Sequence, residues 1–402
     1  MSLNSTPSSE RLHIGFFGCR NAGKSSLVNA VTDQDLAVVS EVRGTTTDPV
    51  SKAMEILPLG PVVIIDTPGF DDAGGQGGIG DLRVRRTKQT LNKTDVAVLV
   101  VDASAGINDY DRELLEIFRQ KQIPHLTVFN KCDLLESVPE DNAEEMWVSA
   151  QKKLRIWELK ERLGRLAPKE DPNRRIIGDL LHPAQTVVLV CPIDESAPKG
   201  RMILPQVQTI RDVLDAGCMP LVTRELELAE SLNALKSQPA IVVTDSQALA
   251  VVSKLTPDEV PLTTFSILMA RYKGFLETAV SGIAQAKHLK DGDTILMAEG
   301  CTHHRQCNDI GTVKIPRLLQ KYTGCSLCFA TCTGTEFPED LSAYAMVIHC
   351  GACMNTDRDV QYRMKCAIDQ NVPFTNYGIT LAQMTGTLER TLRPLPAIHA
   401  LL

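Results

Sequence analysis

The stretch HIGFFGCRNAGKSSLVNAV, residues 13–31, decides the fold of the first part of the chain. Its apolar start predicts a buried strand, its middle a glycine-containing loop, and its end a helix. The loop matches the spacing G-x-x-x-x-G-K-[ST], with Gly18, Gly23, Lys24 and Ser25 in register. In such a loop the backbone N–H groups surround phosphates, the lysine neutralises the β and γ oxygens, and the hydroxyl binds Mg²⁺. A short pattern can match by chance, so the assignment of a nucleotide-binding loop also depends on motifs elsewhere in the chain.

Two later segments supply the remaining groups on the phosphate side. The stretch VVIIDTPGF, residues 62–70, predicts a buried strand that ends at Asp66, which can hold Mg²⁺ through water. Gly69 follows, and its backbone N–H can meet the γ-phosphate. Between the two motifs, RGTTTD offers Thr46 as the switch threonine, with Thr45 as the alternative. These are the groups that phosphate transfer from a nucleoside triphosphate needs.

The base is specified by two further segments. LTVFNKCD, residues 126–133, predicts a strand that ends in Asn130, Lys131 and Asp133. A carboxylate at Asp133 accepts hydrogen bonds from the guanine N1–H and exocyclic amine, a pair that adenine does not offer. WVSA places Ser149 and Ala150 so that a backbone donor can meet the guanine O6. The motifs occur in this order along one chain, so GTP is the expected nucleotide.

The predicted GTPase site is therefore large. Lys24, Thr46, Asp66 and Gly69 are expected to be catalytic, and Ser25 and Thr46 to bind Mg²⁺. The residues expected to bind the nucleotide and its ions are Gly18, Asn21, Gly23, Lys24, Ser25, Ser26, Thr46, Asp66, Asn130, Lys131, Asp133, Ser149 and Ala150.

The order and the residue patterns of these motifs resemble those of the translation-factor-related GTPases of the Era and tRNA-modification type. Phe70 stands where Ras-like enzymes carry a water-orienting Gln, so slow hydrolysis is expected. Asn21 lies three residues before Lys24, and the resemblance implies a K⁺ ion beside the phosphates. The alternative for Asn21 is a turn residue of the loop. The glycine-dense residues 71–87 are expected to become ordered with nucleotide or a partner and to report the GTP state.

Composition limits the remaining function classes. The 402 residues suffice for two to four domains, and the net charge of −7 gives no sign of a nucleic-acid-binding surface. The longest apolar run is too short to span a membrane, and the first thirteen residues contain no apolar signal core. A cytoplasmic protein that binds neither nucleic acid nor membrane is expected.

The second half alternates predicted strands and helices, which favours parallel sheets. The expected fold class is α/β with three domains, each a mostly parallel sheet with helices, and the P-loop GTPase fold first. The expected boundaries are residues 1–168 for the GTPase, 176–266 for a small interaction module and 270–402 for the last domain.

Eight of the twelve cysteines fall between Cys301 and Cys366, which in a cytosolic chain favours metal binding or catalysis over disulfides. Cys301 with His303, and His349 with Cys350 and Cys353, each directly follow a predicted strand. Since the carboxyl ends of parallel strands meet at one edge of a sheet, the two groups are expected to face one another. Thiolate and imidazole ligands suit zinc and an iron–sulfur cluster about equally.

Three other cysteines form a competing group. Cys325, Cys328 and Cys332 lie on one predicted strand, where Cys328 and Cys332 share a face and Cys325 points the other way. They are interpreted as core thiols.

A GTPase followed by a middle module and a C-x-H…H-C-x-x-C pattern resembles the HydF family, the maturation GTPases of iron–iron hydrogenase. The pattern falls on Cys301, His303, His349, Cys350 and Cys353. The resemblance implies a 4Fe–4S cluster held by the three cysteines, with a weakly held fourth position. His303 and His349 are candidate fourth ligands, and Glu299 could also supply an oxygen.

The same resemblance implies the biological role. It implies a scaffold that carries the di-iron precursor of the hydrogenase active site, with radical-SAM hydrogenase maturases and apo iron–iron hydrogenase as partners. A homodimer or higher oligomer, formed through residues 176–266, is expected. The alternative is a zinc-containing Era-like GTPase that assists RNA modification or ribosome assembly, against which the acidic charge argues.

Overall fold

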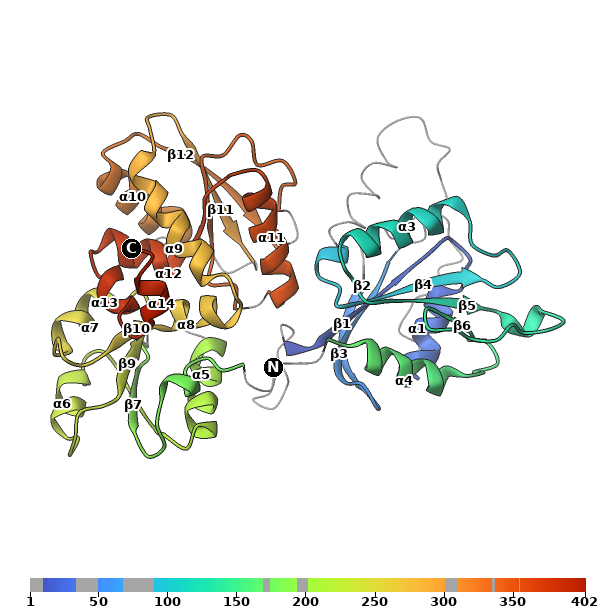
Figure 1. Cartoon of the computed structure of the whole chain (residues 1–402), viewed down its shortest axis with the longest axis horizontal. Helices are drawn as coiled ribbons and strands as arrows, with labels where there is room; N and C mark the ends of the chain where they lie inside the picture. Colours follow the sequence, from blue (N-terminus) through green and yellow to red (C-terminus); the bar gives the residue numbers. More distant parts are fainter. Residues whose placement is uncertain are drawn as a thin grey trace. The chain divides into compact units, whose positions relative to one another are not determined.

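The structure is a computed structural model of the chain and forms two compact units, residues 1–170 and 171–402 (Figure 1). The expected α/β class with three sheets, the GTPase first, is confirmed. The structure describes residues 10–33, 50–67, 90–168, 174–193, 202–300, 310–334, 337–353 and 355–402. The predictions that lie outside the described residues concern Thr45, Thr46, Gly69, Phe70, residues 71–87, Cys301 and His303.

The first unit contains a six-stranded sheet in the order β2-β3-β1-β4-β5-β6, in which β2 alone runs antiparallel to its neighbour. Its strands are β1 (Leu12–Phe17), β2 (Val50–Ile56), β3 (Gly60–Asp66), β4 (Val96–Asp102), β5 (His125–Asn130) and β6 (Glu145–Trp147). Its helices are α1 (Lys24–Thr32), α3 (Asp109–Gln120) and α4 (Ile156–Leu166), with a short 3₁₀ turn at Cys132–Leu134.

The central strand β4 is apolar throughout because both of its faces are covered by helices. Val98 and Val100 belong to the core that packs under α1 and α4, whereas Leu99 and Val101 belong to the core that packs under α3. A parallel strand covered on both faces has no solvent side, so apolar residues do not alternate with polar ones.

The second unit contains two parallel four-stranded sheets. The middle sheet, in the order β10-β9-β7-β8, consists of β7 (Thr186–Val190), β8 (Met219–Thr223), β9 (Ile241–Thr244) and β10 (Leu262–Thr264). The last sheet, in the order β12-β11-β13-β14, consists of β11 (Thr294–Glu299), β12 (Cys328–Thr333), β13 (Met346–His349) and β14 (Phe374–Asn376).

Helices pack on both of these sheets. They are α5 (Leu204–Asp215), α6 (Leu228–Asn233), α7 (Leu249–Leu255), α8 (Phe265–Tyr272), α9 (Leu276–Ala284), α10 (Ile315–Thr323), α11 (Asp357–Asp369), α12 (Tyr377–Met384), α13 (Leu388–Leu392) and α14 (Pro396–His399). Short 3₁₀ turns occur at Gly178–Leu180 and Gln285–His288, and a π-helical turn at Ile310–Lys314 precedes α10.

The middle and last sheets repeat one topology, which the sequence analysis did not predict. Counted within each sheet, the strand order is second, first, third, fourth in both. The registers agree as well, because Val190 pairs with Thr244 as Ala298 pairs with His349. Residues 262–280 thereby correspond to residues 374–392. The identical pairs in this alignment are Thr263/Thr375, Ile267/Ile379, Ala270/Ala382, Gly274/Gly386, Leu276/Leu388 and Glu277/Glu389.

The two modules exchange helices and share one core. Helix α9 follows the middle module but packs on β14 of the last sheet, and α13 follows the last module but packs on β10 of the middle sheet. A Cβ at Gly282 would lie 2.1 Å from the Phe374 carbonyl oxygen, so α9 approaches the strand backbone directly. One apolar cluster runs through both modules. The expected boundary between residues 266 and 270 therefore falls within this exchange, and the domain limits stay predictions.

Candidate functional site

The phosphate loop is closed around its lysine. The side chain of Lys24 is 6% exposed, and its Nζ donates to the carbonyl oxygens of Gly18 at 2.8 Å and Cys19 at 2.7 Å. The ammonium group is thus held inside the loop that joins β1 to α1. This is the position from which it can meet phosphate oxygens.

Both glycines of the loop are required by its geometry. Gly18 has φ 135°, and a Cβ there would lie 2.2 Å from the carbonyl oxygen of Val100. Gly23 has φ 88°, and a Cβ there would lie 2.2 Å from Nδ2 of Asn130. Any side chain would therefore be strained and would displace a neighbouring strand end.

The predicted Mg²⁺ ligands meet at the start of α1. The Ser25 hydroxyl donates to Oδ2 of Asp66 at 3.0 Å. Burial raises the pKa of Asp66, and the hydroxyl of Ser25 and the charge of Lys24 oppose that shift. Oδ1 of Asp66 is buried and has no hydrogen-bond partner among the described residues. A hydroxyl and a carboxylate with a free oxygen are hard ligands that fit Mg²⁺. Ser26, in the first turn of α1, is exposed.

Asn130 joins the phosphate side to the base side of the site. Its Nδ2 donates to the Ala22 carbonyl oxygen at 3.1 Å, and its Oδ1 accepts from the Ala150 N–H at 3.0 Å. Asp133 lies 3.5 Å from Nζ of Lys152, and the hydrogen bond with the buried Ser149 lowers the pKa of its carboxyl. Asp133 is thus an ionised acceptor, as guanine recognition requires.

Lys131 has a partner that the sequence analysis missed. Its Nζ donates to the carbonyl oxygen of Asn21 at 2.7 Å and to the carboxylate of Asp102 at 2.6 Å. Asp102 ends β4, so its place after a buried strand was the available signal. Asn21 itself has φ 63° and an exposed side chain, which agrees with a turn residue. The K⁺ ligand role of Asn21 stays a prediction.

At the last sheet, the residue that precedes Cys301 lies beside the segment that follows β13. Cys350 directly follows β13, and its Sγ accepts the Gly300 N–H at 3.2 Å and the Ala352 N–H at 3.4 Å. Gly300 directly precedes Cys301 in the chain. A Cβ at Gly300 would lie 1.5 Å from Oδ1 of Asn355, so any other residue here would force the buried Asn355 side chain to move. The end of β11 and the start of the cysteine loop after β13 therefore lie at the same carboxyl edge of the sheet, and the meeting of the two predicted half-sites stays a prediction.

The neighbouring groups are arranged around this edge. Burial raises the pKa of the Cys350 thiol, and the two backbone N–H donors oppose that shift. Cys353 is half-buried, and Glu299 is buried at the end of β11, with its Oε1 3.4 Å from the Tyr377 hydroxyl. Within the described ranges, no group of three or more His, Cys, Asp or Glu could hold a metal ion. The predicted set needs Cys301, which lies outside those ranges.

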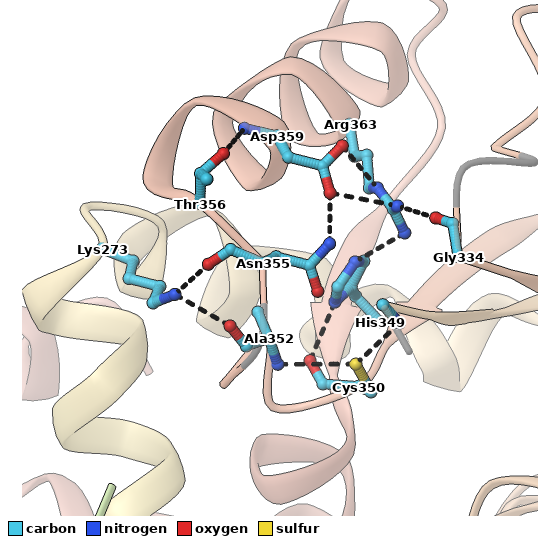
Figure 2. Close-up of polar contacts among 10 residues, drawn as sticks. Lys273, Gly334, His349, Cys350, Ala352, Asn355, Thr356, Asp359 and Arg363 are labelled. Carbon is cyan, nitrogen blue, oxygen red and sulfur yellow. Dashed lines mark hydrogen bonds and ion pairs between the residues drawn. The ribbon is translucent and has the colours of Figure 1, made fainter. Parts of the chain in front are cut away.

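Both ring nitrogens of His349 are hydrogen-bonded to protein atoms (Figure 2). The ring is fully buried, with Nδ1 2.8 Å from the Cys350 carbonyl oxygen and Nε2 3.1 Å from Nη1 of Arg363. Burial, followed by the charge of Arg363, lowers the pKa of His349 to about 3. A neutral ring that donates from Nδ1 and accepts at Nε2 fits these contacts. Iron coordination by His349 stays a prediction and would require one hydrogen bond to break.

The partner of His349 belongs to a buried ionic network that the sequence analysis missed. Arg363 on α11 is 1% exposed, lies 3.1 Å from Asp359 and also donates to the Gly334 carbonyl oxygen. Asn355 donates to the same carboxylate. The i, i+4 spacing of Asp359 and Arg363 was visible in the sequence, but such pairs usually lie on the exposed side of a helix.

Of the competing cysteines, Cys325 and Cys328 lie at the opposite end of the sheet, whereas Cys332 pairs with Ala298 near the carboxyl end of β12. Cys332 is buried, Cys325 is half-buried with its Sγ 3.2 Å from the Leu289 carbonyl oxygen, and Cys328 is exposed at the start of β12. The core interpretation is confirmed for Cys332 and is wrong for Cys328. Strand β12 is an edge strand, so its first residue has no cover.

The fold and the nucleotide motifs define the chain as a P-loop GTPase joined to two further α/β modules. Three family models match it: 50S ribosome-binding GTPase over residues 13–131, Hydrogen maturase F dimerization domain over 176–274, and Hydrogen maturase F tetramerization domain over 277–394. The chain belongs to the hydrogen maturase F (HydF) family, as the sequence resemblance predicted. Two of the three matching models are thus oligomerization domains of that family, and the third is a GTPase domain.

The similar curated proteins match the GTPase part. The tRNA modification GTPase MnmE of Thiobacillus denitrificans is 36% identical over 142 residues, which are 35% of this chain and 31% of that protein. GTPase Der of Wolinella succinogenes is 37% identical over 123 residues, which are 31% of this chain and 26% of that protein. The chain thus spans about a third of the length of the curated relatives that it matches.

Among solved structures, Era in complex with MgGDPNP and nucleotides of 16S ribosomal RNA is 19% identical with a TM-score of 0.35. The match covers 53% of this chain and 91% of Era. No helix in the described part of the chain is both long and apolar enough to cross a membrane.

Proposed function

We propose that this chain hydrolyses GTP and carries a 4Fe–4S cluster and a di-iron precursor, which it delivers to apo iron–iron hydrogenase. The observation that carries the proposal is the hydrogen bond from the Gly300 N–H to Sγ of Cys350 at 3.2 Å. It joins the segment that leads into Cys301 to the segment of Cys350 and Cys353, fifty residues later.

The donor set fits an iron–sulfur cluster. Three thiolates are the ligands that such clusters prefer, and backbone N–H groups directed at a cysteine sulfur stabilise the ligand in its anionic form. The N–H groups of Gly300 and Ala352 already have this arrangement around Cys350. When bound, a cluster with three cysteine ligands supplies one iron position at which cargo can dock.

In the GTPase domain, each residue of the nucleotide site has its own role in the proposed hydrolysis of GTP. Lys24 neutralises the terminal phosphates, Ser25 and Asp66 hold Mg²⁺, and Asp133 selects guanine. Asn130 keeps the phosphate loop and the Ala150 N–H in fixed positions relative to each other. We further propose that K⁺ accelerates hydrolysis, that the protein is cytoplasmic, and that radical-SAM hydrogenase maturases supply the cargo.

Anaerobic reconstitution with iron and sulfide tests the proposal. The parent protein should turn brown, contain about four iron atoms per chain and give a reduced-cluster signal in electron paramagnetic resonance. Cys350→Ala should lose most of this iron, whereas the matched control Cys328→Ala, which replaces an exposed cysteine of the same sheet, should keep it. A colourless protein that takes up zinc in place of iron would overturn the proposal.

A further inference from the structure

Lys273 is a buried lysine of the middle module that reaches the cysteine loop of the last module (Figure 2). It follows α8 directly, and its side chain is 5% exposed. Its Nζ donates to the carbonyl oxygens of Ala352 at 2.8 Å and Asn355 at 2.6 Å. The carboxylate of Asp357 lies 3.9 Å away. A charged group this deeply buried is tolerated only because it is hydrogen-bonded and near a counter-charge.

The two carbonyl groups lie on either side of Cys353, and the first of them belongs to the turn that sets the spacing of the cysteines. Ala352 lies between Cys350 and Cys353 and has φ 57°, a left-handed conformation that costs a non-glycine residue about 1 kcal/mol or more. Its N–H is bonded to Sγ of Cys350, and its carbonyl oxygen to Lys273. Ala352 is thus held from both sides of the residue.

The internal repeat shows that the helix end does not itself need a lysine. Thr385 corresponds to Lys273, and the backbone N–H groups of both bond to the carbonyl four residues earlier, at 3.0 Å and 2.9 Å. Each is followed by a left-handed glycine, Gly386 or Gly274. The Thr385 hydroxyl bonds to Leu381, Ala382 and Thr387 at the end of its own helix. The same helix end is therefore formed with a threonine, and the lysine serves the loop that it reaches.

We propose that Lys273 is a positioning residue for the iron–sulfur site: it holds the Cys350–Cys353 turn and places a positive charge beside it. The role of the positive charge rests on the proposed function. The role in holding the turn rests on the hydrogen bonds to Ala352 and Asn355. It gives the module that matches the dimerization domain a direct part in the cluster site of the other module.

The first experiment needs no cluster. Amide hydrogen exchange over residues 350–356 is compared in cluster-free parent, Lys273→Thr and Lys254→Thr. Lys273→Thr introduces the residue that the other copy uses at this helix end, and Lys254→Thr replaces an exposed lysine of the same module as a control. We expect about tenfold faster exchange in Lys273→Thr alone, because local opening no longer breaks two hydrogen bonds. Lys273→Met, which keeps the side-chain length but not the charge, should behave like Lys273→Thr.

The second experiment measures the midpoint potential of the reconstituted cluster. Without a nearby positive charge the added electron is less stabilised, so reduction should become about tenfold less favourable, or roughly 59 mV lower. Exchange of residues 350–356 equal to that of the parent in both Lys273 variants would overturn the proposal. Faster exchange in the Lys273 variants, together with a parent protein that takes up no iron, would support the role of Lys273 in holding the turn. It would contradict the proposed function instead.

Discussion

Replacing Arg363 with methionine should strongly destabilise the second unit without touching the nucleotide site. Arg363 is 1% exposed, and its guanidinium is shared among Asp359, His349 and the Gly334 carbonyl oxygen. Methionine fills a similar length of space but donates no hydrogen bond, so the Asp359 carboxylate would remain buried without its cation. Breaking a buried ion pair by removing one partner costs about 3–5 kcal/mol.

This cost converts into a melting temperature. For a unit of this length, 1 kcal/mol corresponds to about 2–4 °C, so Arg363→Met should lower the Tm of the second unit by roughly 6–20 °C. Scanning calorimetry of the full chain measures it. The matched control is Arg393→Met, which breaks a pair with Glu389 whose side chains are 54% and 68% exposed, and it should change the Tm by less than about 2 °C.

A double variant separates the lost ion pair from poor packing. Asp359→Asn combined with Arg363→Met removes both charges, and it should recover more than half of the lost Tm because no buried charge is left unpaired. An Arg363→Met protein that melts within about 2 °C of the parent would refute the reasoning. A double variant that is less stable than the single one would show that the stabilisation comes from the Asp359 contacts with other groups.

Three further predictions concern the GTPase unit. Burial raises the pKa of Asp66, so the folded state favours the neutral form of this carboxyl. The resulting stabilisation of the folded state is present below the pKa that Asp66 has in the unfolded chain, and it is lost as the pH rises through the pKa in the folded state. Asp66→Asn should therefore raise the Tm of the nucleotide-free unit at pH 7 while it lowers Mg²⁺-dependent GTP turnover by about 100-fold or more, and an unchanged Tm would contradict the burial argument. Asp133→Asn replaces an acceptor with a donor opposite guanine and should turn over xanthosine triphosphate at least tenfold better than GTP; GTP turnover equal to that of the parent would show that the guanine site is misassigned. Hydrolysis should be faster in K⁺ than in Na⁺, and Asn21→Ala should abolish the difference; equal parent rates in the two salts would leave Asn21 as a turn residue.

The nucleotide site was predictable from the sequence because its chemistry is encoded locally. Gly18 and Gly23 lie in the loop, and Lys24 and Ser25 in the first turn of α1, so the spacing within one short segment indicates their roles. Asp66 ends a buried strand that pairs with β1, and its position at the end of an apolar run was visible in the sequence. The predicted meeting of the two cysteine segments rested on one topological rule, that carboxyl ends of parallel strands share an edge.

The rest depended on contacts between distant segments. The sequence by itself determined the class of the fold and the GTP-binding motifs, because short-range spacing specifies them. Only the tertiary structure decided that Arg363 is buried, that His349 has both nitrogens engaged, and that Lys273 reaches the loop of another module. Periodicity says which face of an element is apolar but not which partner covers it, and a charged side chain is read as exposed until a distant element is seen to cover it. Arg363 is covered by His349 and by the Gly334 turn, and Lys273 by the loop of Ala352 and Asn355, and no local pattern encodes these contacts.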